Sequence, residues 1–242
     1  MAHYARLDRD RARRVGVPEI VLGEGKTVAH LVGILETLQR KGVGALVSRP
    51  TPAQRRAIRR ARRTGLRVDE LAGGRLLRLA GPLGVEYRRG VAAVVSAGTS
   101  DVPLAEEAHA LLSALGIRVV SAHDVGVAGL HRLLGAVERL ERRAPEIYLV
   151  FAGREGALPT VIAGLVRAPV VGIPTSVGYG RGGRGEAALS AMLQSCAPIA
   201  VVNIDAAVPA ALFAAQRFAT RTGAPRVRDG SPRSAPRRTR RT

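Results

Sequence analysis

Hydroxyl, carboxylate and glycine residues gather where apolar runs of this chain end. The first such segment, SAGTSD at residues 96–101, follows the apolar run 91–95 and precedes a helical pattern. Small residues let backbone amides approach an anion, hydroxyls can donate to phosphate, and the N-terminus of the following helix is positive. Helix capping by Ser100 or Asp101 is the simpler alternative, but it explains one polar residue rather than four. We therefore expect a phosphate or ribose site formed by Ser96, Gly98, Thr99, Ser100 and Asp101.

Two further loops carry groups that can move protons or hold a substrate. His123 can transfer a proton and Asp124 can bind a hydroxyl or a metal-bound water, although such residues also serve as helix caps and loop ligands. Glu155 stands beside Gly156 at a helix entrance, where a carboxylate can act as a base or bind a substrate cation. Its alternative role is a favourable interaction with the helix dipole. The glycine-rich segment 174–185, which contains Ser176, suits a loop that closes over a ligand.

The chain has one cysteine, Cys196. A thiolate is a strong nucleophile, but a lone buried cysteine more often acts as a small apolar residue. A single cysteine also excludes an internal disulfide, which favours a reducing compartment. No residues show the spacing of zinc ligands, so the sequence assigns no metal site.

Alternating apolar runs and helical patterns must position these residues. Such alternation predicts an α/β fold with a doubly wound parallel sheet of three layers, in which ligands bind beyond the carboxyl ends of the strands. The predicted strands are 91–95, 117–121, 147–152, 170–173 and 199–202. The predicted helices are 101–115, 129–142, 159–166, 185–196 and 208–218.

The first 84 residues form a separate pattern, which predicts a small α/β N-terminal domain. Its predicted elements are a strand at 20–22, a helix from Thr27 to about 41, a strand at 44–48, a basic helix at 52–64 and strand-like or irregular segments over 68–79. Glycine and proline interrupt the periodicity near residues 80–89, so we place the second domain at 85–220. Residues 221–242 are rich in arginine and proline and are expected to be a disordered tail.

Composition bounds the function. With 46% hydrophobic residues over 242, the chain can bury a core. The net charge of +19 would suit a polyanion, yet the chain has only two lysines and few aromatics, so the charge resembles an arginine-biased genome more than a binding face. We expect no specific nucleic-acid partner, and attraction of a phosphorylated small substrate fits the same charge. No apolar segment suits a signal peptide or a membrane span, which predicts a cytoplasmic protein.

The order of the loops resembles two related enzyme groups. The run SAGTSD, SAH and AGREGALPTVIAGLVRAPVVGIP is similar to the aminoimidazole ribonucleotide carboxylases and mutases of purine synthesis. The sequence more closely resembles the pyridinium-3,5-biscarboxylic acid mononucleotide synthases of nickel-pincer cofactor synthesis, which share that domain. The closer likeness lies in RARRVGVPEIVLGEGKT, SAGTSDVPLAEEA, DVGVAGLHRLL, GREGALPTVIAGLV, PTSVGYG, ALSAMLQSCA and VVNID.

This resemblance implies a reaction. The synthases carboxylate the pyridinium ring of nicotinic acid adenine dinucleotide at carbon 5, with carbon dioxide or bicarbonate as co-substrate, and then hydrolyse the phosphoanhydride to release AMP. It implies that Cys196 is the nucleophile, which adds to ring carbon 4, and that Glu155 is a candidate base. A magnesium ion (Mg2+) could assist the anhydride cleavage. The resemblance also implies a homo-oligomer, a tetramer or an octamer.

Three departures leave other functions open. The synthases usually have methionine where this chain has Arg154, asparagine where it has Gln194, and Asn-Gly-Phe-Gly where it has 206–209. One alternative is a purine-type carboxylase or mutase that uses His123 and needs no thiol. The other is a degenerate nucleotide-binding or assembly subunit.

Overall fold

The second half of the chain folds around a parallel sheet in the computed structural model, which describes residues 11–220. The strands are β5 (Val91–Ser96), β6 (Arg118–Ala122), β7 (Ile147–Ala152), β8 (Val170–Pro174) and β9 (Ile199–Val201). Their order is β6-β5-β7-β8-β9, and every neighbouring pair is parallel. This is the flavodoxin-like order, so the predicted doubly wound fold is confirmed.

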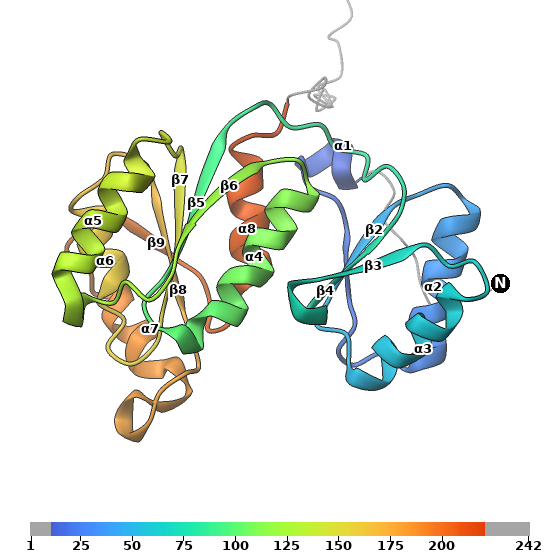
Figure 1. Cartoon of the computed structure of the whole chain (residues 1–242), viewed down its shortest axis with the longest axis horizontal. Helices are drawn as coiled ribbons and strands as arrows, with labels where there is room; N and C mark the ends of the chain where they lie inside the picture. The colour runs from blue at the N-terminus through green and yellow to red at the C-terminus, as the bar shows by residue number, and fades with distance from the viewer. Residues whose placement is uncertain (1–10, 221–242) are drawn as a thin grey trace, which may run out of the picture.

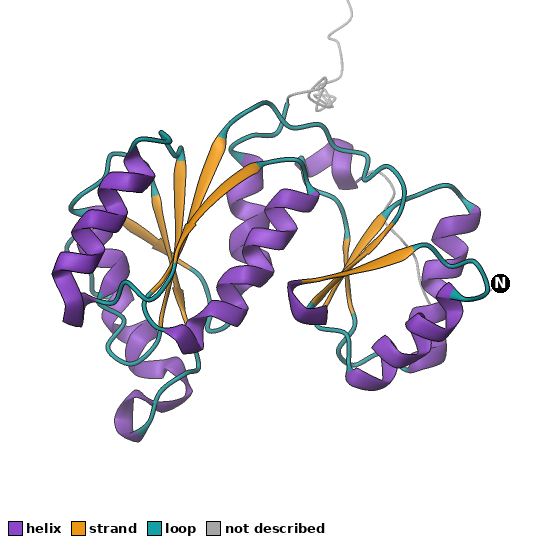
Figure 2. Cartoon of the chain, in the orientation of Figure 1, coloured by secondary structure: helices purple, strands orange, loops and turns teal. Residues whose placement is uncertain are grey.

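Helices cover both faces of this sheet (Figures 1 and 2). On one face lie α5 (Leu130–Glu141), α6 (Leu158–Ala163) and α7 (Glu186–Leu193). On the other face, α4 (Val102–Ala114) and α8 (Ala207–Gln216) pack against each other. The central strands β5, β7 and β8 are buried along nearly their whole length, as their continuous apolar runs require.

The N-terminal part forms a second, mixed sheet. Its strands are β1 (Ile20–Leu22), β2 (Ala45–Ser48), β3 (Val68–Leu71) and β4 (Leu76–Leu79), in the order β1-β2-β4-β3. The helices α2 (Val28–Arg40) and α3 (Pro52–Arg62) cover its outer face, and the predicted cap Thr27 accepts a hydrogen bond from the amide of His30. Strands β1 to β4 and helices α2 and α3 form one unit with its own apolar core.

The inner face of that sheet packs on α4, so α4 and α8 lie between the two sheets (Figure 1). Leu46 and Leu76 of the N-terminal sheet share one apolar core with Leu104 and Ala108 of α4. This shared core fixes the N-terminal unit against the parallel sheet. The carboxyl ends of β2 and β9 consequently open on the same side of the molecule, where the side chain of Arg49 donates to the carbonyl oxygen of Asp205.

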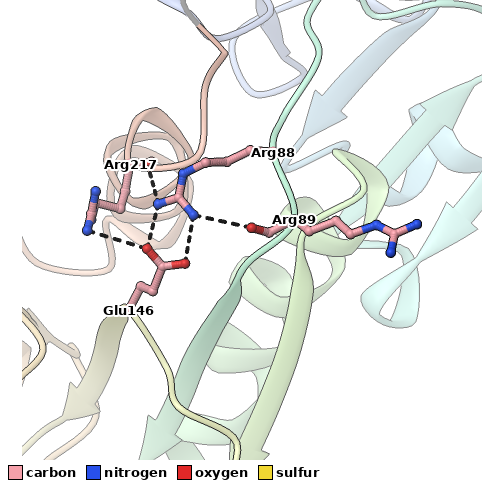
Figure 3. Close-up of polar contacts among 4 residues, drawn as sticks. All are labelled: Arg88, Arg89, Glu146 and Arg217. Carbon is pink, nitrogen blue, oxygen red and sulfur yellow. Dashed lines mark hydrogen bonds and ion pairs between the residues drawn. The ribbon is translucent and has the colours of Figure 1, made fainter.

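A charged clamp joins the linker between the sheets to the end of α8 (Figure 3). The guanidinium of Arg88 binds the carboxylate of Glu146 through both terminal nitrogens, and Arg217 approaches the same carboxylate at 3.4 Å. Arg88 also lies 5.3 Å from the ring centre of Phe218. Gly90 makes this possible, because a Cβ there would come within 2.7 Å of a carboxylate oxygen of Glu146.

Several predicted boundaries are wrong. The helix predicted over 185–196 ends at Leu193, so Cys196 lies in a loop, and the helix predicted over 159–166 ends at Ala163. Pro198 disfavours helical backbone at Ala197, and the hydroxyl of Ser195 accepts the amide of Ala197 instead. A short helix, α1 (Arg11–Val15), was not predicted. The predicted tail, 221–242, lies outside the described residues.

Candidate functional site

A cleft of about 400 Å³ lies at the carboxyl edge of the parallel sheet. It is lined by the loops that follow β5, β6 and β7, and by Val177 beyond β8. The strand order reverses between β5 and β7, which is where ligands bind in folds of this type. Four of the predicted site residues line this cleft: Gly98, Ser100, Asp101 and Glu155.

Asp101 holds the first loop in place through hydrogen bonds of its side chain. Its side chain is buried. One carboxylate oxygen accepts a hydrogen bond from the amide of Gly98 at 2.9 Å, and the other accepts one from the hydroxyl of Thr175 at 2.6 Å. It makes no side-chain capping bond to α4, and its bond from the Gly98 amide instead caps the short 3-10 turn Thr99–Asp101 that precedes α4. Burial raises the pKa of the Asp101 carboxyl, and the hydrogen bonds from Thr175 and Gly98 oppose that rise.

Ser96 and His123 lie behind the cleft rather than on its surface. Ser96 is fully buried, and its hydroxyl is 3.0 Å from Nδ1 of His123. Nε2 of His123 is 3.1 Å from a carboxylate oxygen of Glu106 on α4. A hydroxyl, an imidazole and a carboxylate thus form one chain of hydrogen bonds, which can fix the imidazole tautomer and pass a proton. The sequence did not single out Glu106.

The remaining residues of the first two loops face solvent. Thr99 is exposed, and the exposed carboxylate of Asp124 binds Arg132 at 2.7 Å. His123 also lines an open groove beside β6 and α5, which is separate from this cleft. The predicted pair His123 and Asp124 is therefore divided: the half-buried imidazole bonds to Ser96 and Glu106, and the exposed carboxylate bonds to Arg132.

Glu155 projects at the mouth of the cleft, on a loop whose glycines are needed for close packing. A Cβ on Gly153 would overlap the carbonyl oxygen of Val177, and one on Gly156 would lie 2.6 Å from the carbonyl oxygen of Ala188. The third loop is therefore pressed against the fourth loop and α7. Arg154, one of the departures from the family pattern, stacks on the exposed ring of Tyr179 at 4.7 Å from the ring centre.

Asp205, after β9, joins the fourth loop to the N-terminal unit. Its carboxylate accepts the amide of Ser176 at 2.8 Å, and its own amide donates to Pro174. Ser176 itself is exposed, and the cleft wall is formed by its neighbour Val177. Arg49, Asp124, Arg154 and Asp205 all follow strands and all have φ between 47° and 56°. Such backbone strain is held in place by its surroundings and is common at functional sites.

The altered segment 206–209 begins α8. Ala206 and Ala207 are buried there, and the alanines that follow at 210, 211 and 214 pack fully buried within the core shared with α4. The segment therefore acts as the start of a packed helix, and it does not line the cleft among the residues that the structure describes.

Cys196 lies at the opposite edge of the sheet. It is exposed and lies three residues before the start of β9, where Ile199 pairs with Val170 at the start of β8. The loops of the cleft follow the other ends of the strands. Within the described part of one chain, the cleft therefore contains Glu155 but not Cys196.

A metal site is not formed by these side chains. Within residues 11–220, no group of three or more His, Cys, Asp or Glu side chains could hold a metal ion. The magnesium ion implied by the family resemblance is therefore not held by a cluster of three such side chains in this region. In the same region, no helix is both long and apolar enough to span a bilayer.

Comparison with known proteins agrees with this architecture. Residues 91–229 match the family described as AIR carboxylase, and residues 1–76 match the LarB/PurE-like N-terminal domain. An uncharacterized protein of Methanocaldococcus jannaschii is 37% identical over 216 residues, covering 86% of this chain and 82% of the relative.

Two further relatives match the second half alone. An N5-carboxyaminoimidazole ribonucleotide mutase of Pyrococcus horikoshii is 32% identical over 127 residues, covering 50% of this chain and 68% of the relative. The mutase of the same name from M. jannaschii is 28% identical, covering 52% and 77%. The chain therefore belongs to the AIR carboxylase family, a family of carboxylase and mutase enzymes, and it carries a LarB/PurE-like N-terminal domain ahead of the carboxylase-type domain.

Proposed function

We propose that this protein carboxylates the pyridinium ring of nicotinic acid adenine dinucleotide at carbon 5 and then hydrolyses the phosphoanhydride. The products are pyridinium-3,5-biscarboxylic acid mononucleotide and AMP. The observation that carries the proposal is the exposed thiol of Cys196 in a chain that joins a LarB/PurE-like N-terminal domain to a carboxylase-type cleft. A purine-type reaction has no need of that thiol.

The chemistry requires a nucleophile because a pyridinium ring is too electron-poor to attack carbon dioxide. Addition of the Cys196 thiolate to ring carbon 4 makes carbon 5 the nucleophilic end of an enamine. Carbon 5 then bonds to carbon dioxide. Its proton passes to a base, the role we assign to Glu155, and the electrons of that C–H bond expel the thiolate and restore the aromatic ring. The first loop, built around Asp101, holds the phosphate and ribose.

Because Cys196 lies at the amino edge of its own sheet, we propose that a second copy supplies the thiol to each cleft. A closed homo-oligomer, a tetramer or an octamer, can bring the amino edge of one sheet to the carboxyl edge of another. Cytoplasmic location and bicarbonate or carbon dioxide as co-substrate belong to the same proposal.

The test is mass spectrometry of products formed from the dinucleotide, bicarbonate and magnesium. Wild type is expected to form the biscarboxylated mononucleotide, and Cys196→Ala and Glu155→Gln are each expected to form none. Mixing the two inactive variants under conditions that exchange subunits should restore about a quarter of the sites, because thiol and carboxylate come from different copies. Product from Cys196→Ala alone rules out the thiol mechanism. Failure of the mixture to regain activity rules out the shared site.

A second candidate is a purine-type mutase, favoured by the hydrogen-bonded chain from Ser96 through His123 to Glu106. It predicts turnover of N5-carboxyaminoimidazole ribonucleotide that survives Cys196→Ala and is lost in His123→Asn. Turnover of neither substrate by wild type would favour a degenerate nucleotide-binding subunit.

A further inference from the structure

A second cleft, of about 530 Å³, lies between the N-terminal unit and the parallel-sheet domain. Its walls come from the loop after β1, the end of β2, the start of α3, the turn between β3 and β4, and Asp205. Two carboxylates, Glu24 and Asp205, lie among them. Three arginines, Arg49, Arg55 and Arg75, line it. We propose that this cleft binds a nucleotide phosphate and, resting on the proposed function, that it receives the adenylate half of the dinucleotide.

Two of the three guanidinium groups are positioned by contacts across the domain boundary. Arg49 donates to the carbonyl oxygen of Asp205, and its other terminal nitrogen is 4.0 Å from a carboxylate oxygen of Glu24. Nε of Arg75 is 3.3 Å from a carboxylate oxygen of the fully buried Glu107 on α4. These contacts each use part of a guanidinium that has five N–H groups, so both arginines keep donors for a ligand in the cleft.

Arg55 differs from them because its described contacts stay within the N-terminal unit. One terminal nitrogen donates to the carbonyl oxygen of Gly73 at 3.2 Å, and its Nε is buried without an acceptor among the described residues. Gly74 has φ of +84°, and a Cβ there would overlap the guanidinium and lie 2.9 Å from Cδ of Arg55. The glycine turn thus leaves the space that Arg55 occupies, and no carboxylate is bonded to its charge in the described structure.

The chemistry of the walls favours phosphate. The planar, forked donors of arginine match phosphate oxygens, and the volume lies within the range of small-ligand sites, about 300–1,000 Å³. The start of α3 contributes little, because Pro52 has no amide hydrogen and the amide of Gln54 already donates to Thr51. Recognition therefore falls to the arginine side chains.

Asp205 connects this cleft to the first one. It lines the second cleft and accepts the amide of Ser176, while the neighbours of Ser176 face the first site: Thr175 binds Asp101 and Val177 forms a wall. A three-residue segment therefore separates the two clefts. A dinucleotide that lies across this segment would place its anhydride between the phosphate loop at Asp101 and the arginines.

The test measures AMP binding to the full-length protein by calorimetry, with inorganic phosphate as a competitor. Arg55→Gln should weaken AMP binding by about tenfold, the loss expected for one charged hydrogen bond to phosphate. Arg56→Gln, on the exposed side of α3, is the matched control and should bind AMP as wild type does. Circular dichroism verifies that both variants are folded.

The outcomes separate this inference from the proposed function. AMP that fails to bind wild type, or binds Arg55→Gln as tightly, overturns the adenylate site even if carboxylation depends on Cys196. AMP binding that depends on Arg55, in a protein that makes no biscarboxylated product, supports a nucleotide-phosphate site and removes the proposed reaction. Binding of nicotinic acid mononucleotide should be unchanged in Arg55→Gln, and an equal loss for both mononucleotides contradicts the division into two halves.

Discussion

Asp101 and Thr175 tie together two loops that lie 74 residues apart in the chain. The hydroxyl of Thr175 donates to the Asp101 carboxylate at 2.6 Å, and both side chains are buried. One residue ends the loop after β5, and the other follows β8. The shape of the first cleft therefore depends on a bond between residues that no local sequence pattern connects.

Replacing Thr175 with valine tests this bond. The substitution keeps the size of the side chain but leaves one Asp101 oxygen without its donor, which should lower the free energy of unfolding by about 1–3 kcal/mol. Urea denaturation measures the change, and Thr175→Ser, which keeps the hydroxyl, is the matched control. If Thr175→Val and wild type unfold at the same urea concentration, the bond does not stabilise the loop.

Glu107 should make stability depend on pH. Burial raises the pKa of its carboxyl, and the charge of Arg75 only partly opposes the rise. A raised pKa in the folded state gives a contribution to stability that is complete at low pH and is lost as pH rises through that pKa. Relative to Glu107→Gln, wild type should therefore lose stability as pH rises from about 4.

Denaturant unfolding across that pH range measures the difference between the two proteins. Glu36→Gln, at an exposed position on α2, is the control and should follow the wild-type curve. A constant difference between wild type and Glu107→Gln at every pH would contradict the prediction.

Gly153→Ala should displace the loop that carries Glu155. The added methyl overlaps the carbonyl oxygen of Val177 and lies 2.8 Å from the hydroxyl oxygen of Thr175. Overpacking of this kind typically costs about 1–3 kcal/mol, and here it also moves a wall of the cleft. We expect lower thermal stability and weaker binding of nicotinic acid mononucleotide. Gly183→Ala, where a Cβ meets nothing, is the control.

The sequence was informative about the edge of the sheet at which each polar loop would lie. Continuous apolar runs separated by helical patterns predict parallel strands, and residues directly after such strands share one edge. Asp101 and Glu155 are found there for that reason. Contacts between distant loops, such as Thr175 with Asp101 or Arg49 with Asp205, depend on tertiary packing and leave no local signal.

The position of Cys196 at the amino edge of the sheet also follows from the predicted order of helices and strands. A residue that follows a helix and precedes a parallel strand lies at the amino edge, because the helix has returned the chain to the start of the sheet. The sequence pattern placed Cys196 just before the strand at 199, so the same rule separates it from the loops of the cleft.

Glu146→Gln should loosen the clamp between the linker and α8 (Figure 3). The hydrogen bonds from Arg88 lower the pKa of the Glu146 carboxyl, and the charges of Arg88 and Arg217 act in the same direction. A lowered pKa contributes stability above the unfolded-state pKa, and this is lost as pH falls through the folded-state value. Because the side chains are partly exposed, we expect a loss of about 1 kcal/mol at neutral pH.

The loss in Glu146→Gln should shrink toward acidic pH and also in high salt, where the ion pairs are screened. Denaturant unfolding at two salt concentrations measures both trends. Glu138→Gln removes an exposed ion pair to Arg142 at the end of α5, so it should change stability less. If both variants lose the same free energy at every pH, the bonds to Arg88 are no stronger than an ordinary surface pair. The linker would then be held to the segment after α8 by backbone bonds, from the Arg88 amide to Phe218 and from the Thr220 amide to Glu86.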